Sequence, residues 1–277
     1  IGGHWNRAIL IDDSRCGGGK LGAARGSGCG PSNLSVTDPS IVGKWSHVAA
    51  TFKHGEFSYT FLDGVKSNNL GAPTHGDGDS SLAIGASATW FGLNCYARVS
   101  SVRIYDRVLT DAEINEEVGI GAGAALGSAA QATEAPNGFS AADALVVNLE
   151  AGSYSGSGDW NDPITGKGAV LEGGVTWESS TGVPAFKFDS SDDRIKINDI
   201  QIGPSVYQEL TMTAWVYMDS FGANCWVVNQ EIGGHWNRAI LIDDGRCGGG
   251  KLGAAKGGGC GNSNLSVTQP SIVGKWS

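Results

Sequence analysis

The chain has 277 residues, of which 44 are glycine and 17% are charged, and its formal net charge at pH 7 is −9. This acidic balance argues against nucleic acid or an anionic membrane as the partner. None of the apolar runs in the sequence approaches the roughly 20 residues that a membrane-spanning helix needs. The high glycine content and the shortage of helical periodicity favour short strands and tight turns, and therefore an all-β protein.

The first part of the sequence returns at its end. Residues 1–46 and 232–277 align without a gap at an offset of 231 residues. The positions that differ are Ser14/Gly245, Arg25/Lys256, Ser27/Gly258, Pro31/Asn262 and Asp38/Gln269. A single globular domain has no use for a near-copy of its own first residues, so the pattern predicts tandem repetition with a period of 231 residues. Because the chain lacks an initial Met and stops within the repeated pattern, we expect a fragment of a longer repetitive protein.

The segment after the first copy predicts a run of short strands. Residues 47–63 alternate apolar with small or polar side chains around a turn at 53–56, which predicts two strands. Asp63-Gly64 is a two-residue hairpin signal, so a return strand should begin at Val65.

A helix should close this part of the chain. Strands are predicted at 82–85 and 97–106, where alternation returns. Thr110 and Glu113 then form a capping box, which predicts a short helix ending near Val118.

Residues 119–140 differ from their surroundings, because they are rich in Gly and Ala. We interpret them as an interdomain linker, with a small-residue segment buried between domains as the alternative. A new domain should start near Ala141. Its predicted strands are 145–149, 185–188, 194–197, 210–218 and 225–228, the second and third being interpreted as a pair.

This pattern divides the chain into two incomplete domains. Residues 1–118 are predicted to be the C-terminal part of one domain, 119–140 the linker, and 141–277 the N-terminal part of the next. Read in the order 141–277 and then 47–118, the two parts make one whole domain, and the linker completes the period.

Read in that order, the sequence contains an ordered set of motifs. They are the strand-rich stretch at 145–174, PAFKFDSSDDRIKI at 184–197, LTMTAWVYM at 210–218, GKWSHVAATF at 43–52, FLDGV at 61–65, LAIGAS at 82–87 and RVSSVRIYDRVLTDAEI at 98–114. With these motifs the sequence resembles the laminin-G-like (concanavalin A-like) jelly-roll family. The resemblance implies an all-β sandwich of two antiparallel sheets, repeated in tandem, with one short helix near the domain end.

The cysteines fall into four per period, an even number that suits disulfide bonds. The Gly-rich spacing between Cys16 and Cys29 predicts a loop closed at its base. Cys95 and Cys225 remain as a pair, and in this chain they come from different copies. The alternative is a set of reduced, buried thiols. Cys247 and Cys260 repeat the first two cysteines.

The sequence shows no string of carboxylates that indicates catalysis. Related hydrolases place paired carboxylates on alternate residues of one strand, so that the pair faces one cleft. Asp12-Asp13 and Asp192-Asp193 are adjacent instead, so on a strand they would point to opposite faces. We therefore predict a protein that is not an enzyme and requires no cofactor.

Calcium is the one ligand ion for which the sequence offers candidates. Asp77 and Asp79, separated by Gly, suit oxygen ligation by a flexible loop, and Asp159 with Asp162 form a second candidate pair. The alternative for both pairs is a solvated acidic turn.

Carbohydrate is the other candidate ligand. Four tryptophans lie beside Gly, Asn or Asp and could stack on sugars, with core packing as the alternative. They are Trp5, Trp90, Trp160 and Trp236. Asn33 and Asn264 occupy equivalent N-x-S motifs and are predicted glycosylation sites.

Two functions follow from these features. The first is a structural protein of an extracellular filament or surface fibre, whose partners are copies of itself. The alternative is a lectin-like adhesion array on the cell surface, in which repetition supplies avidity for glycans and calcium assists binding.

Overall fold

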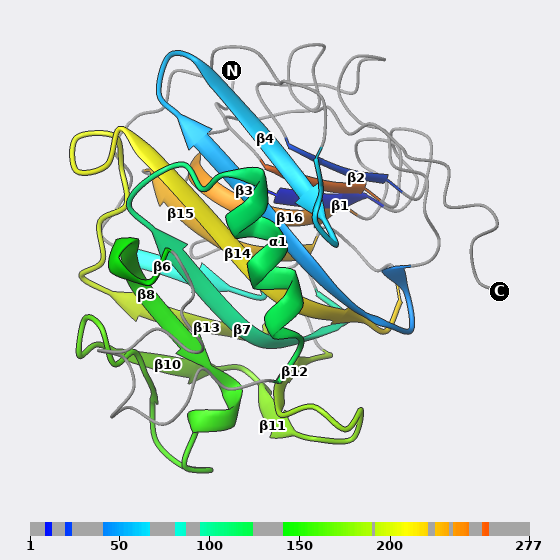
Figure 1. Ribbon diagram of the computed structural model, residues 1–277. Helices are drawn as coiled ribbons and strands as arrows, with labels where there is room; N and C mark the ends of the chain where they lie inside the picture. Colours follow the sequence, from blue (N-terminus) through cyan, green and yellow to red (C-terminus); the bar gives the residue numbers. More distant parts are fainter. Residues whose placement is uncertain are drawn as a thin grey trace, which may run out of the picture.

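The computed structural model describes residues 9–12, 20–23, 41–66, 81–86, 95–123, 141–189, 192–220, 225–232, 235–243 and 251–254. Within these residues the strands form two antiparallel sheets that pack face to face (Figure 1). None of the described helices is long and apolar enough to cross a membrane.

The first sheet contains both copies of the repeated strands, and we call it the repeat sheet. Its order is β2 (Lys20–Ala23), β1 (Ile9–Asp12), β17 (Lys251–Ala254), β16 (His235–Asp243), β15 (Cys225–Ile232), β6 (Ser81–Ile84), β13 (Arg194–Asn198), β10 (Gly168–Glu172) and β9 (Trp160–Asn161).

The second sheet lies under the helix α1 (Asp111–Ile120), and we call it the helix sheet (Figure 1). Two short 3₁₀ turns, η4 (Ala142–Ala144) and η5 (Ala151–Ser153), flank its strand β8. Its order is β11 (Thr176–Glu178), β12 (Ala185–Phe188), β7 (Ala97–Tyr105), β14 (Glu209–Met218), β3 (Trp45–Lys53), β4 (Phe57–Leu62) and β5 (Val65–Lys66), with β8 (Leu145–Glu150) beside β7.

The core between the sheets follows from the two-residue period of the strands. In β14, alternate residues from Leu210 to Met218 enter the core, and β3 contributes Val48, Ala50 and Phe52 from the same sheet. The repeat sheet contributes apolar side chains to the same core, and these are Leu82, Ile84, Ile195, Ile197 and Val228. The two-sheet β sandwich is therefore confirmed, and its form agrees with a jelly roll.

Both sheets are built jointly by two stretches that are far apart in sequence. In the helix sheet, β14 lies between β3 and β7, and in the repeat sheet β6 lies between β13 and β15. Residues 41–123 and 141–232 therefore complete each other. The expected boundaries at 118 and 141, and the tandem period, stay predictions.

Several local predictions are confirmed by the backbone. Leu62 pairs with Val65, and Asp63 and Gly64 both have positive φ angles, of 48° and 79°, as a type I′ hairpin turn requires. Gly64 also has no room for a side chain, because the amide of Asn115 in α1 occupies the place of a Cβ. The hairpin turn is thereby packed against the helix.

One pairing prediction is wrong. The strands at 185–188 and 194–197 exist as β12 and β13, but they lie in different sheets. β12 pairs with β7 and β11, whereas β13 pairs with β6 and β10. The connection between them crosses the sandwich, and side-chain alternation alone does not indicate which sheet a strand joins.

Candidate functional site

The outer face of the helix sheet carries polar side chains in register. Trp215 of β14 stands opposite His47 of β3 on one side and Ser101 of β7 on the other. In the next row, Thr213 stands between Ala49 and Arg103. These residues alternate with the core positions, so they point away from the sandwich interior.

Helix α1 covers this face, and its start is fixed by several contacts. Thr110 Oγ1 accepts from the backbone N–H of Glu113, and the Glu113 carboxylate accepts from the N–H of Thr110, which confirms the capping box. Arg107 donates two hydrogen bonds to Glu113, at 2.7 and 2.9 Å. The Arg107 hydrogen bonds lower the pKa of Glu113 to about 2, so this cap stays charged.

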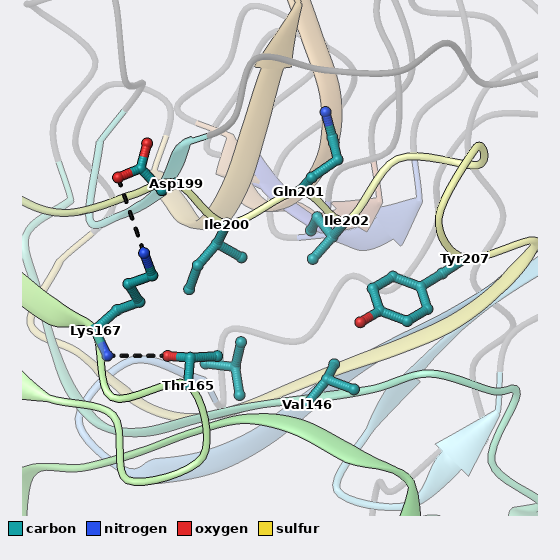
Figure 2. A pocket seen from close by; sticks show the side chains of 9 residues that line it. Val146, Thr165, Lys167, Asp199, Ile200, Gln201, Ile202 and Tyr207 are labelled. Atoms are coloured by element: carbon teal, nitrogen blue, oxygen red, sulfur yellow. Dashed lines mark hydrogen bonds and ion pairs between the residues drawn. The ribbon is translucent and has the colours of Figure 1, made fainter.

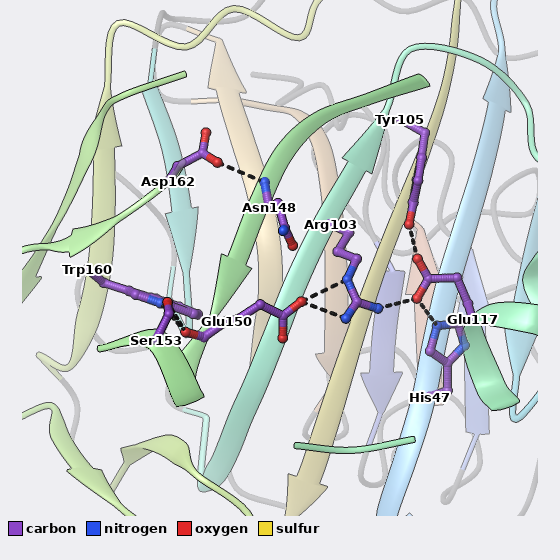
Figure 3. Close-up of polar contacts among 9 residues, drawn as sticks. All are labelled: His47, Arg103, Tyr105, Glu117, Asn148, Glu150, Ser153, Trp160 and Asp162. Carbon is purple, nitrogen blue, oxygen red and sulfur yellow. Dashed lines mark hydrogen bonds and ion pairs between the residues drawn. The ribbon is translucent and has the colours of Figure 1, made fainter. Parts of the chain in front are cut away.

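Under the helix, one buried arginine joins two buried carboxylates (Figure 3). Arg103 Nη1 donates to Glu117 Oε2 of α1 at 2.5 Å, and Arg103 Nε and Nη2 donate to Glu150 Oε1 of β8 at 2.9 and 2.6 Å. The Tyr105 hydroxyl donates to the other oxygen of Glu117. The His47 ring lies 3.8 Å from Glu117 and packs edge-on against Trp215. We call Arg103, Glu117, Glu150, Tyr105 and His47 the arginine network.

The charges of the arginine network are set by burial and by each other. Burial lowers the pKa of Arg103, but the charges of Glu117 and Glu150 outweigh it and hold the pKa above its ordinary value. Burial would raise the pKa of Glu117, yet the charge of Arg103 leaves it lowered. For Glu150, burial dominates over Arg103 and raises the pKa to about 7. Arg103 and Glu117 therefore form the ion pair, and Glu150 titrates near neutral pH.

This arrangement is closed to solvent. Arg103, Tyr105, His47 and Glu117 are at most 1% exposed, and Glu150 is 6% exposed. A pair of carboxylates that acts on a glycoside must face a cleft that admits the sugar and a water molecule. The arginine network offers no such opening, so its geometry serves to attach α1 and β8 to β7 and not to hold a substrate.

A cavity of about 180 Å³ opens elsewhere on the sandwich, between β8 and the segment that follows β13 (Figure 2). Lys167 and Asp199 face each other at one side, with Nζ and Oδ2 3.9 Å apart and both side chains well exposed. Asp199 has a φ angle of 58°, in the left-handed region that Asp tolerates better than most residues. The rest of the lining is mixed apolar and polar, and consists of Val146, Val147, Thr165, Ile200, Gln201, Ile202 and Tyr207.

The prediction that Trp160 is an exposed sugar-stacking residue is wrong. Trp160 is fully buried in β9, and its indole N–H donates to the carbonyl of Glu150 at 2.9 Å. Its ring also packs against Phe186, so the indole belongs to the core. Trp177, which the sequence analysis did not single out, is 41% exposed in the short strand β11 at the edge of the helix sheet.

The calcium candidate at Asp159 and Asp162 is a turn in this structure. Asp162 is buried, and its carboxylate accepts from the backbone N–H groups of Asn148, Ile164 and Thr165. The contacts with Ile164 and Thr165 are the kind that an Asx turn makes, and the contact with Asn148 holds the loop to β8. No group of three or more potential metal ligands occurs among the residues that the structure describes.

Of the cysteines, Cys95 can be described fully. It is buried and takes part in a disulfide bond. The backbone N–H of Asp219 donates to the carbonyl of neighbouring Tyr96, which places Cys95 beside the end of β14. Cys225 begins the next strand, β15, where the structure describes its backbone only. This arrangement favours the pairing of Cys95 with Cys225, which stays a prediction.

The remaining predicted site residues are not tested by the structure. Trp236 lies in β16, for which only the backbone is described. The others fall outside the described residues, and they are Trp5, Cys16, Cys29, Asn33, Asp77, Asp79, Trp90, Cys247, Cys260 and Asn264.

The family comparison agrees with the fold. Residues 7–115 match the family model Laminin G 3, of the concanavalin A-like lectin/glucanases superfamily. Residues 7–115 are therefore similar to a laminin-G-like, concanavalin A-like domain. No curated protein and no solved structure matches the chain. Because the superfamily includes both lectins and glucanases, the match alone does not decide between binding and hydrolysis.

The arginine network should be essential for stability at neutral pH. Glu117→Gln removes the charge that balances the buried Arg103, so we expect the free energy of unfolding at pH 7 to fall by about 3 kcal/mol. The matched control is Glu116→Gln, one residue earlier on the exposed side of α1, which should change it by less than about 0.5 kcal/mol. Urea unfolding followed by circular dichroism measures both. Equal effects of the two substitutions would show that the buried ion pair is unimportant.

Glu150 should make stability depend on pH. Its pKa is raised to about 7 in the folded chain from an ordinary value of 4.5, so the folded state binds the extra proton between these values. This contribution is complete below pH 4.5 and is lost as the pH rises through about 7.

Glu150→Gln should remove this dependence. The free energy of unfolding of the wild type, relative to that of the variant, should fall by up to about 3 kcal/mol between pH 4.5 and 7. Urea unfolding at several pH values provides the comparison, and Glu116→Gln should follow the wild-type curve. Parallel curves for the wild type and Glu150→Gln would contradict the raised pKa.

Proposed function

We propose that the protein is a non-catalytic structural subunit, a tandem array of laminin-G-like domains that assembles into an extracellular filament or surface fibre. The observation that carries the proposal is the complementarity of residues 41–123 and 141–232, which together build both sheets. In a repetitive chain, every copy would offer both parts to its neighbours.

Two connections lead to the same sandwich. In this chain, the first part reaches the second through residues 119–140, whereas in the predicted repeat the second part continues directly into the next copy of the first. Because both routes bury the same surfaces, a part can pair with the copy before it or after it. A contact that repeats in one direction without closing on itself generates a filament.

The chemistry of the described residues supports a structural role. The buried carboxylates Glu117 and Glu150 hold α1 and β8 in place and have no access to a substrate. The disulfide bond of Cys95 favours an oxidising, extracellular environment. Glycans at Asn33 and Asn264, and calcium at Asp77 and Asp79, remain part of the proposal as stabilising additions.

Electron microscopy of a recombinant chain with several whole repeats tests this proposal. We expect unbranched filaments with a constant axial rise of about one domain. Separate domains on flexible connections, with no contact between neighbours, would refute the assembly function. A single-repeat chain is the control, because it should show far shorter assemblies at the same concentration.

The second candidate is a lectin-like binding array, and the cavity favours it. The charged pair Lys167 and Asp199 together with Gln201 offers donors and acceptors for the hydroxyl groups of a sugar. The partly buried Tyr207 adds an aromatic wall. In this function, repetition would convert weak single-site binding into avidity.

Titration calorimetry with a panel of monosaccharides, with and without calcium, tests the cavity. Lys167→Met should weaken any binding about tenfold or more, because a charged hydrogen-bond donor is lost. Lys196→Met is the matched control, since Lys196 lies on the neighbouring strand β13 and does not line the cavity. Loss of binding in both variants, or in neither, would exclude the cavity as the sugar site.

A further inference from the structure

Strand β8 is held in the helix sheet from one side only. Among the described strands its single neighbour is β7, whereas β7, β14 and β3 each pair with strands on both sides. The ladder between β7 and β8 also loses its regular register between Ile104 and Tyr105. An edge strand has fewer backbone hydrogen bonds to break than a central strand, so β8 is placed to open before the rest of the sheet.

Side chains cover the outer edge of β8 in place of a further strand (Figure 3). The N–H of Asn148 donates to Asp162 Oδ1 at 2.9 Å. The indole N–H of Trp160 and the hydroxyl of Ser153 donate to the carbonyl of Glu150, at 2.9 and 2.7 Å. An opening of β8 therefore breaks one ladder and a few local contacts, and no second ladder.

The side chain of Glu150 closes β8 onto β7. Its Oε1 accepts both hydrogen bonds from Arg103, and this contact crosses from β8 to β7 beneath α1. Among the described residues, the charged groups that act on Glu150 are Arg103 of β7 and Glu117 of α1. Glu117 in turn contacts Tyr105 of β7 and His47 of β3. The strand is thus fastened through an ionisable group that lies at most 6% exposed.

The packing of β8 is uneven along its length. Val147 and Leu149 enter the core, so opening exposes apolar surface and the open state stays a minor one. At the beginning of the strand, however, Val146 and Val147 line the cavity of about 180 Å³. Side chains that border a cavity have fewer contact atoms on that side, so this end of β8 is less firmly packed.

We propose that β8 is a pH-controlled latch: with a proton on Glu150 the strand is held on β7, and without the proton it opens locally and removes its wall of the cavity. The latch goes beyond both proposed functions, because it requires neither assembly nor a sugar. It would regulate any ligand of the cavity, since Val146 and Val147 are in place only when the strand is closed.

Burial sets the direction of the effect. It raises the pKa of Glu150 to about 7, whereas the opened strand returns the carboxyl group to water and to its ordinary value of 4.5. The closed state therefore has its full gain from the proton below pH 4.5, and this gain is lost as the pH rises through about 7. Acid closes the latch, and neutral to alkaline conditions loosen it.

Native-state hydrogen exchange tests for the local opening in the full chain. Nuclear magnetic resonance follows the N–H groups of Val147 and Leu149, which alternate with that of Asn148 and so face β7, with the central strand β14 as the reference. Protection is corrected for the intrinsic pH dependence of exchange. At low urea concentrations, β8 should exchange faster than β14 and independently of urea, because a local opening exposes little surface.

The same measurement at several pH values asks whether Glu150 controls the opening. Between pH 4.5 and about 8, the opening equilibrium constant of β8 in the wild type should rise by up to about 300-fold. Glu150→Gln resembles the protonated side chain, so its opening constant should stay near the low-pH value of the wild type throughout. Glu116→Gln, on the exposed side of α1, is the matched control and should follow the wild type.

Two results would overturn the latch. Equal protection and equal urea dependence of β8 and β14 would show that β8 opens only when the whole domain unfolds. Local opening with the same pH dependence in the wild type and in Glu150→Gln would show that another group controls it. Because the experiment needs neither filaments nor a ligand, its outcome is separate from that of the assembly and sugar-binding tests.

Discussion

The constraint on which the helix sheet depends is the need to neutralise Arg103 away from water. A guanidinium group that is 1% exposed must keep its partners, because an unpaired buried charge is strongly destabilising. Glu117 brings α1 onto the sheet and Glu150 brings β8 beside β7. The capping box at Thr110 then sets where the helix begins, so that Glu117 reaches Arg103 from above. The position of α1 on the sheet, the neutralisation of Arg103 and the residue at which the helix begins therefore depend on one another.

The same network also links the two parts of the chain. Arg103 and Glu117 belong to residues 41–123, whereas Glu150 belongs to residues 141–232. The two parts also bury apolar surface against each other in the core. Apolar contacts, however, are not directional and tolerate displaced registers. A shift of β8 by one residue would turn Glu150 toward the opposite face and leave Arg103 without that partner. The hydrogen bonds of Arg103 to Glu117 and Glu150 therefore favour one register in any pairing of the two parts, whether the parts come from one copy or from two.

Much of this fold is present in the local sequence, and the missing information is non-local. Alternation located β14, Asp63-Gly64 located a hairpin, and Thr110 with Glu113 located α1. Arg103 lies on the face of β7 that points away from the core, and its burial under α1 is not indicated by the local alternation. Polar residues flank Trp160 and made it a candidate for sugar stacking, whereas its indole is buried and reaches the carbonyl of Glu150. Residues distant in sequence decide which sheet a strand joins and which element covers its outer face.

The contacts of the described carboxylates support the proposed structural role. Among the residues that the structure describes, carboxylates with perturbed pKa values such as Glu117 and Glu113 make buried or capping contacts, whereas a catalytic acid must meet a substrate. Its repeated strands, in contrast, offer main-chain groups in one register to more than one partner. In the proposed assembly, a domain that closes when its complementary parts meet, and whose register is favoured by buried charge, would gain order from each neighbour that it adds. Such a domain is suited to build an array whose length is set by the number of copies available.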